Sequence, residues 1–319
     1  MEYKKFLITG ATGFVGSHLV EKLVNLKSKV LATTHHPILP HSYFKTKNLS
    51  QKCEVVKIDL CDLSKTVKLI ENFKPDYIFH LAAQPLVEVA YADPKNTLYS
   101  NIVGTINVLE STRLLSKIKG IIVASSDKAY GKIDPKTNRK YIESDPLRGD
   151  HPYEVSKSSV DLIAYSYFKT YNLPVVITRF GNIYGQGDIH FSRLIPGIIK
   201  AIIHNELFGI RSNGKFVRDY LYVKDVVLGY LTLADNIDKV KGGAFNFGSD
   251  ESYNVLELIK VLTGILRKPL KYKILNIPKN EIPYQSLDWS KIRKTLGWQP
   301  KYSLQTTINE IYRWYLKYF

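Results

Sequence analysis

Tyr153 and Lys157 are the two residues whose types and spacing most directly suggest chemistry. Residues four apart share one face of an α-helix, so the ammonium group of Lys157 can lie near the phenol of Tyr153. A nearby positive charge lowers the pKa of a tyrosine from about 10 toward neutrality, and the phenolate can remove a proton from an alcohol. Ser125 and Ser126 end a predicted strand and are placed to hydrogen-bond the reacting hydroxyl. A Tyr-x-x-x-Lys spacing is common by chance, so its weight depends on the surrounding elements.

A glycine-rich segment near the start of the chain predicts a dinucleotide site. Gly10, Gly13 and Gly16 follow an apolar strand and lead into a helix. Glycine there permits a tight turn, close approach of the backbone to a pyrophosphate, and binding of the phosphates at the helix N-terminus. A flexible loop is the alternative, but the position between a first strand and a first helix favours the dinucleotide. The cofactor-binding residues predicted in this segment are Gly10, Thr12, Gly13, Phe14, Val15 and Gly16.

The elements that must position these groups alternate through the first half of the chain. Short apolar segments, typical of strands buried on both faces, alternate with segments of helical spacing such as 18–26 and 66–73. This predicts an α/β fold with a doubly wound parallel sheet, a Rossmann fold, with strands at 6–9, 29–33, 54–58, 77–80, 121–125 and 175–179. After about residue 180, glycines and prolines indicate a smaller, interleaved C-terminal α/β substrate domain. We expect the dinucleotide-binding domain over 1–180, with part of about 221–249, and the substrate domain mainly over 181–319.

The composition limits the classes of protein to consider. The chain has 319 residues, a formal net charge of +16 and two cysteines. No apolar run approaches the roughly 18–20 residues that span a bilayer, and no signal peptide is recognised, so we expect the cytoplasm and no membrane partner. Cys53 and Cys61 lack partner cysteines and metal-spaced histidines, so neither a disulfide framework nor a metal site is predicted. The lysines are scattered, which favours an anionic small ligand over nucleic acid.

The G-x-x-G-x-x-G spacing, taken with Tyr153 and Lys157, resembles the extended short-chain dehydrogenase/reductase superfamily. The resemblance implies a tightly bound NAD(P) that is regenerated within the cycle, and a nucleotide-linked sugar as substrate. A carboxylate at the end of the second strand would repel a 2′-phosphate, but Thr34 and His35 stand there, so NAD versus NADP stays open. The further cofactor-binding residues that the resemblance implies are Thr34, His35, Asp59, Leu60, Leu81, Ala82, Ala83, Asn101, Ser125, Tyr153 and Lys157.

Asp127 and Lys128 narrow the resemblance. Segment 125–131 resembles the active-site segment of nucleotide-sugar 4,6-dehydratases, and an Asp-Lys pair is similar to the CDP-glucose and the inverting UDP-N-acetylglucosamine enzymes. Oxidation at C4 acidifies the C5 proton; one group then removes that proton, another protonates the departing C6 hydroxyl, and hydride returns to C6. The resemblance implies Asp127 as the acid and Lys128 as the base, roles that burial would favour through both pKa values. A solvated salt bridge in a loop is the alternative. The predicted catalytic residues are Ser126, Asp127, Lys128, Tyr153 and Lys157.

The second half of the chain carries groups suited to a nucleotide sugar. Asn182 belongs to an R-x-x-N-x-Y-G segment of the same superfamily, and the resemblance places Arg218 on the substrate diphosphate, where a guanidinium fork suits phosphate oxygens. Segments 284–291 and 296–300 resemble the C-terminal pattern of CDP-glucose 4,6-dehydratases. Those enzymes are somewhat longer and do not continue Asp-Lys into Ala-Tyr-Gly, so GDP- or UDP-linked hexoses, or a heptose, stay open. The predicted substrate-binding residues are Gln84, Ser126, Asn182, Arg193, Arg218 and Tyr284.

The expected function is therefore that of an NAD(P)-dependent nucleotide-sugar 4,6-dehydratase, which converts an NDP-hexose to an NDP-4-keto-6-deoxyhexose. A nucleotide-sugar 4-epimerase with the same tyrosine, lysine and cofactor is the first alternative. A non-catalytic cofactor sensor or nucleic-acid-binding protein of the same fold is the second, and the intact Tyr153, Lys157 and serine pair argue against it. The superfamily commonly dimerises through the helix that carries the tyrosine, which implies a homodimer or a dimer of dimers.

Overall fold

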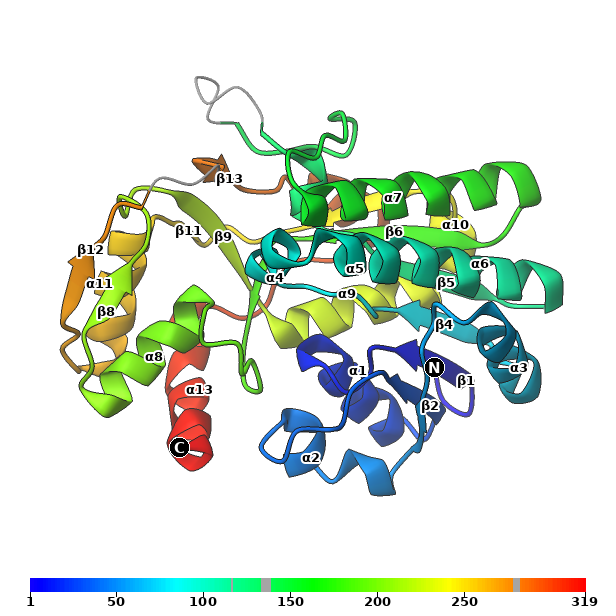
Figure 1. The fold of residues 1–319 in the computed structure, drawn as a ribbon, viewed down its shortest axis with the longest axis horizontal. Helices are drawn as coiled ribbons and strands as arrows, with labels where there is room; N and C mark the ends of the chain where they lie inside the picture. Colours follow the sequence, from blue (N-terminus) through cyan, green and yellow to red (C-terminus); the bar gives the residue numbers. More distant parts are fainter. Residues whose placement is uncertain (116, 133–138, 278–281) are drawn as a thin grey trace.

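A seven-stranded parallel sheet forms the centre of the computed structural model, which describes residues 1–115, 117–132, 139–277 and 282–319 (Figure 1). The strand order is β10-β6-β5-β4-β1-β2-β3, and every neighbouring pair is parallel. The predicted Rossmann-type sheet is confirmed, and each of the six predicted strands is present within one residue of its predicted bounds. The strands are β1 (Lys5–Thr9), β2 (Lys29–Thr34), β3 (Glu54–Lys57), β4 (Tyr77–His80), β5 (Gly120–Ala124), β6 (Val175–Phe180) and β10 (Ala244–Phe247).

The central sheet is buried on both faces, as its uninterrupted apolar strands require. Successive side chains of a strand point to opposite faces, so Phe6 and Ile8 belong to one core cluster and Leu7 to another. The first cluster is covered by α1 (Phe14–Asn25) and α9 (Val223–Asp235). The second is covered by α3 (Leu63–Phe73), α6 (Gly104–Leu115) and α7 (Pro152–Tyr171).

The strand order reverses direction between β1 and β4, and this reversal positions the site. From β1 the chain runs outward to β2 and β3, then returns to place β4 on the other side of β1. The loops that leave β1 and β4 therefore diverge and open a crevice at the carboxyl ends of the strands, where ligands bind in folds of this kind. Gly10 directly follows β1, and Leu81 directly follows β4.

The C-terminal half of the chain builds a smaller α/β layer beside this crevice (Figure 1). One sheet has the order β11-β9-β13, with β7 also paired to β9, and a second pairs β12 with β8. Helices α8, α11 and α13 pack around a separate apolar core there. The domain division at about residue 180 stays a prediction. The bounds are β7 (Asn182–Tyr184), α8 (Leu194–His204), β8 (Phe208–Ile210), β9 (Val217–Tyr222), β11 (Ser252–Tyr253), α11 (Val255–Leu266), β12 (Tyr272–Ile274), β13 (Tyr284–Gln285) and α13 (Leu304–Tyr318).

Short helices complete the described part of the chain and connect the longer elements. They are α2 (Tyr43–Thr46), α4 (Val87–Ala92), α5 (Pro94–Leu98), α10 (Ile237–Val240), α12 (Ser290–Leu296), the 3-10 helices η1 (Leu49–Gln51) and η3 (Asp127–Tyr130), and the π-helix η2 (Tyr99–Val103). Within the described ranges, none of the helices combines the length and apolar character needed to cross a bilayer.

Candidate active site

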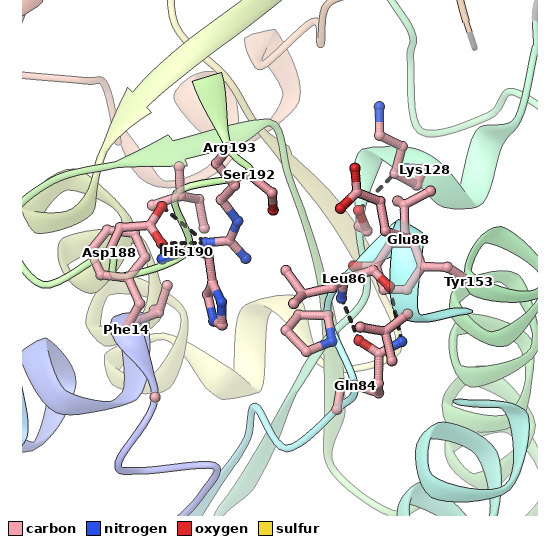
Figure 2. Close-up of a pocket in the computed structure, with 18 of the residues that line it drawn as sticks. Phe14, Gln84, Leu86, Glu88, Lys128, Tyr153, Asp188, His190, Ser192 and Arg193 are labelled. Carbon is pink, nitrogen blue, oxygen red and sulfur yellow. Dashed lines mark hydrogen bonds and ion pairs between the residues drawn. The ribbon is translucent and has the colours of Figure 1, made fainter. Parts of the chain in front are cut away.

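A cavity of about 1520 Å³ extends from the glycine loop, past the ends of β4 and β5, to the C-terminal strands. Figure 2 shows Arg193 on one wall of this cavity and Tyr153 on the opposite wall. Three predicted site residues, Asn101, Lys157 and Tyr284, lie outside the lining. The predicted residues that line it are Gly10, Thr12, Gly13, Phe14, Val15, Gly16, Thr34, His35, Asp59, Leu60, Leu81, Ala82, Ala83, Gln84, Ser125, Ser126, Asp127, Lys128, Tyr153, Asn182, Arg193 and Arg218.

The glycine loop is shaped to hold a pyrophosphate. Gly10 has a φ of +65°, and a Cβ atom there would lie 2.9 Å from the backbone of Ala82, so only glycine fits without strain. A Cβ atom on Gly16 would collide with the carbonyl oxygen of Gly10. Helix α1 begins at Phe14, and Gly13 at its N-cap has no side chain to occupy the first N–H groups. These residues fit a dinucleotide, whose phosphates would meet the N-terminus of α1.

The end of β2 carries hydroxyl and imidazole groups. The Thr34 hydroxyl receives a hydrogen bond from Thr12 at 2.9 Å and donates one to the carbonyl of His36 at 2.7 Å. His35 lies 3.9 Å from the carboxylate of Asp59, and both side chains are exposed. The carboxylate beside His35 thus comes from the segment after β3. β2 itself supplies no carboxylate that would select a ribose hydroxyl over a 2′-phosphate.

Tyr153 and Lys157 lie in the first turns of α7, and both are buried. The amino group of Lys157 donates a hydrogen bond to the carbonyl oxygen of Ala124 at 2.8 Å, at the end of β5. Burial lowers the pKa of Lys157 to about 8. Burial also raises the pKa of Tyr153 to about 12, although a hydrogen bond with Ser126 acts in the opposite direction. Among the protein's own groups, desolvation of the phenolate outweighs the hydrogen bond and the charges around it. The lower pKa expected from Lys157 together with an oxidised nicotinamide stays a prediction.

Ser126, Asp127 and Lys128 follow β5 and enter the same cavity as Tyr153. Asp127 is 4% exposed, and its Oδ1 accepts a hydrogen bond from the Ser126 hydroxyl at 2.9 Å. Ser126 also caps η3, because its Oγ accepts the backbone N–H of Lys128 at 3.1 Å. The second carboxylate oxygen of Asp127 is buried, with no hydrogen-bond partner among the described residues. A solvated loop carboxylate is thus the wrong interpretation of Asp127, which points to a role for its free oxygen.

Two further residues, which were not predicted from the sequence, contact or face Asp127 and Lys128. Gln285 is fully buried on β13; its amide nitrogen donates to the carbonyl of Asp127 at 3.0 Å, and its amide oxygen accepts a hydrogen bond from the Lys128 amino group. Asp219 is buried on β9, and burial, followed by the charge of Asp127, raises its pKa to about 7. The only signal for them in the sequence was that they directly follow Tyr284 and Arg218, which were predicted as substrate-binding residues.

The wall contributed by the C-terminal half carries the groups predicted for the diphosphate. Asn182 on β7 donates to the carbonyl of Asp219 at 3.3 Å. Arg193, just before α8, donates to both carboxylate oxygens of Asp188 at 3.1 Å (Figure 2). Arg218 on β9 donates to the carbonyl of Val217 at 2.8 Å. The side chains of Asn182, Asp188, Arg193 and Arg218 line the cavity. The two arginines bring positive charge to this wall, and that of Arg193 is balanced by the buried carboxylate of Asp188.

Gln84 and Asn101 brace the floor between β4 and α7. The side chain of Gln84 donates to the carbonyl of Leu86 at 2.9 Å (Figure 2). It also donates to the hydroxyl of Thr97 at 3.0 Å. Asn101 is buried, accepts the backbone N–H of Gln84 at 2.7 Å and donates to the hydroxyl of Ser156 at 2.9 Å. Asn101 therefore holds the loop after β4 against α7, and this contact fixes Gln84 relative to Tyr153.

Comparison with known proteins agrees with this geometry. Residues 6–248 match the model of the NAD dependent epimerase/dehydratase family. The CDP-glucose 4,6-dehydratase of Salmonella typhimurium is 31% identical, over 98% of this chain and 90% of that protein. The UDP-glucose 4-epimerase of Thermotoga maritima, solved with UDP-glucose, superposes with a TM-score of 0.86 at 27% identity, over 98% of this chain and 99% of the other. The dTDP-glucose 4,6-dehydratase DesIV of Streptomyces venezuelae, solved with NAD and TYD bound, gives a TM-score of 0.86 at 25% identity, over 98% and 97%.

Proposed function

The chain belongs to the NAD-dependent epimerase/dehydratase family, and within it we propose that this protein is a nucleotide-sugar 4,6-dehydratase. The proposed reaction converts an NDP-hexose to an NDP-4-keto-6-deoxyhexose and releases one water. The single observation that carries the proposal is that the buried carboxyl group of Asp127, with Lys128 beside it, lines the same cavity as Tyr153. An enzyme that only oxidises and reduces C4 has no use for a second acid and base.

The proposed roles follow the order of the reaction. Tyr153, as phenolate, takes the proton of the C4 hydroxyl, which Ser126 orients. A bound nicotinamide would accept the C4 hydrogen as hydride and return it to C6. Lys128 then takes the proton from C5, and Asp127 gives a proton to the departing C6 oxygen, which leaves as water. When the hydride has returned to C6, Lys128 gives the proton back to C5, which completes the 4-keto-6-deoxy sugar. Lys157 is proposed to favour the phenolate of Tyr153 with its positive charge.

The proposed cofactor is NAD or NADP, held by the glycine loop and by the residues after β2, β3 and β4. Relatives support NAD, because DesIV was solved with it. At this chain's own β2 terminus, Thr34 and His35 line the cavity and place no carboxylate there that would repel a 2′-phosphate. For the substrate, Asn182, Arg193 and Arg218 are proposed to hold the diphosphate, where two guanidinium groups offset its charge.

A panel of CDP-, GDP-, UDP- and dTDP-glucose tests the proposal by mass spectrometry. A dehydratase yields a product lighter by one water that carries a carbonyl group. A nucleotide-sugar 4-epimerase, the second candidate, yields an isomer of unchanged mass; its specific support is the 27% identity and full-length superposition with the Thermotoga maritima enzyme. If every active substrate gives an isomer without loss of water, the proposed dehydratase function is wrong and the protein is a 4-epimerase.

The proposed assembly is a homodimer or a dimer of dimers formed through α7. On the outer face of α7, the side chains of Leu162 and Tyr165 are exposed. Exposed apolar side chains that gather on one helix face are typical of an interaction surface.

A further inference from the structure

Gln285 links the C-terminal sheet to the catalytic segment after β5. Strand β13 pairs in parallel with β9, and this register places Gln285 opposite Arg218. Gln285 is fully buried, so its amide must find partners within the protein. It finds them in two consecutive residues that lie more than a hundred positions earlier in the chain, Asp127 and Lys128.

Each end of the Gln285 amide contacts a different member of the acid–base pair. Its nitrogen donates to the backbone carbonyl of Asp127 at 3.0 Å, which fixes the start of η3. Its oxygen accepts a hydrogen bond from the amino group of Lys128. In Figure 2 the amino group of Lys128 points away from Tyr153, the direction in which Gln285 holds it. The contacts of Tyr153 and Lys157 with Ser126 and Ala124 do not involve Gln285.

We propose that Gln285 is a positioning residue for the elimination step, which orients Asp127 and Lys128 without serving the oxidation at C4. This inference rests on the proposed 4,6-dehydratase reaction. The two steps use different side chains within one cavity, and Gln285 contacts the backbone of Asp127 and the side chain of Lys128, the two residues of the second step. Its pairing with Arg218 also sets the distance between the acid–base pair and the arginine proposed for the diphosphate.

The variant Gln285→Leu separates the two steps. We expect formation of the keto-deoxy sugar to fall by about 100-fold, the scale of a small misplacement of reacting groups. We expect oxidation at C4 to continue, so that reduced nicotinamide accumulates after substrate is added and is visible by its absorbance. Ser286→Ala is the matched control, because Ser286 is buried on the same segment and its hydroxyl contacts Ser252 instead. It should leave both steps at the wild-type rate.

Gln285→Glu provides a second readout that does not depend on complete loss of the contacts. A carboxylate beside the Lys128 amino group favours the protonated lysine, so product formation should move to higher pH. Equal losses of C4 oxidation and of product formation in Gln285→Leu, or no loss of product, would overturn the inference. An unaltered pH profile in Gln285→Glu would also overturn it. Failure of the proposed function is a separate result, because it appears in the wild-type protein as the absence of a dehydrated product.

Discussion

The amino group of Lys157 donates a hydrogen bond to the carbonyl oxygen of Ala124, 2.8 Å away, and this contact joins α7 to the end of β5. Ser125 and Ser126 follow Ala124 directly, so the same contact sets the position of the serines relative to Tyr153. The cost of this arrangement is a buried amino group, because burial lowers the pKa of Lys157 to about 8.

The variant Lys157→Met tests how burial of this amino group affects the stability of the folded protein. A lysine with a pKa lowered from 10.5 to about 8 in the folded protein binds its proton more weakly there than in the unfolded chain. The wild-type protein therefore gains stability as pH rises from about 8 to about 10.5, a gain that the variant lacks. The Tm of the variant minus that of the wild type should fall across this window and stay level below it. A constant difference in Tm from pH 7 to pH 10.5 would show that the lysine is not desolvated. Separately, we expect the variant to lose turnover at every pH.

Gly10→Ala tests the shape of the cofactor loop. The positive φ of Gly10 and the nearby backbone of Ala82 leave no space for a methyl group. We expect a loss of about 1–3 kcal/mol in the free energy of unfolding, and weaker binding of NAD and NADP by calorimetry. Gly264→Ala is the control: this glycine lies within α11, and a Cβ atom there meets nothing within 4 Å. It should gain about 0.5–1 kcal/mol and bind cofactor unchanged. A loop that accepts alanine at position 10 without either loss would not be the proposed pyrophosphate cradle.

Asp219→Asn tests the buried carboxyl group next to Asp127. The pKa of Asp219 is raised from 3.8 to about 7 by burial and by the charge of Asp127, while Lys140 acts in the opposite direction. A raised carboxyl pKa stabilises the folded protein below about pH 4, and this stability is lost as pH rises to about 7. The wild-type Tm should therefore fall, relative to the variant, between pH 4 and pH 7. Parallel Tm curves in this interval would show that Asp219 is ionised throughout.

The sequence could predict the residues that directly follow parallel strands. Gly10, Leu81 and Ser125 come after β1, β4 and β5, and the carboxyl ends of these neighbouring strands meet at one edge of the sheet. The period of the apolar segments was enough to locate those strands, because a sheet covered on both faces needs continuous apolar runs.

The sequence could not predict the contacts made by the C-terminal strands. Gln285 and Asp127 are 158 positions apart. Long-range contacts of the C-terminal segment, such as the pairing of β13 with β9 and the bridge between Tyr141 and Leu287, bring them together. The resemblance selected Tyr284, yet neighbouring residues of a strand point to opposite faces, and it is Gln285 that reaches Asp127 and Lys128. The effect of burial on the pKa of Tyr153 could not be predicted for a related reason, because enclosure of the phenol depends on the whole fold rather than on the spacing of Tyr153 and Lys157.

The fate of the C4 hydrogen tests the proposed dehydratase most directly. An active nucleotide hexose carrying deuterium at C4 is converted, and the product is examined by NMR and mass spectrometry. We predict that the deuterium appears in the C6 methyl group of a product that has lost one water, because Tyr153 serves the oxidation at C4 while Asp127 and Lys128 serve the elimination that opens C6 to the returning hydride. Deuterium retained at C4, in a product with the mass of the substrate, would contradict the proposed role of Asp127 and Lys128 and identify a 4-epimerase.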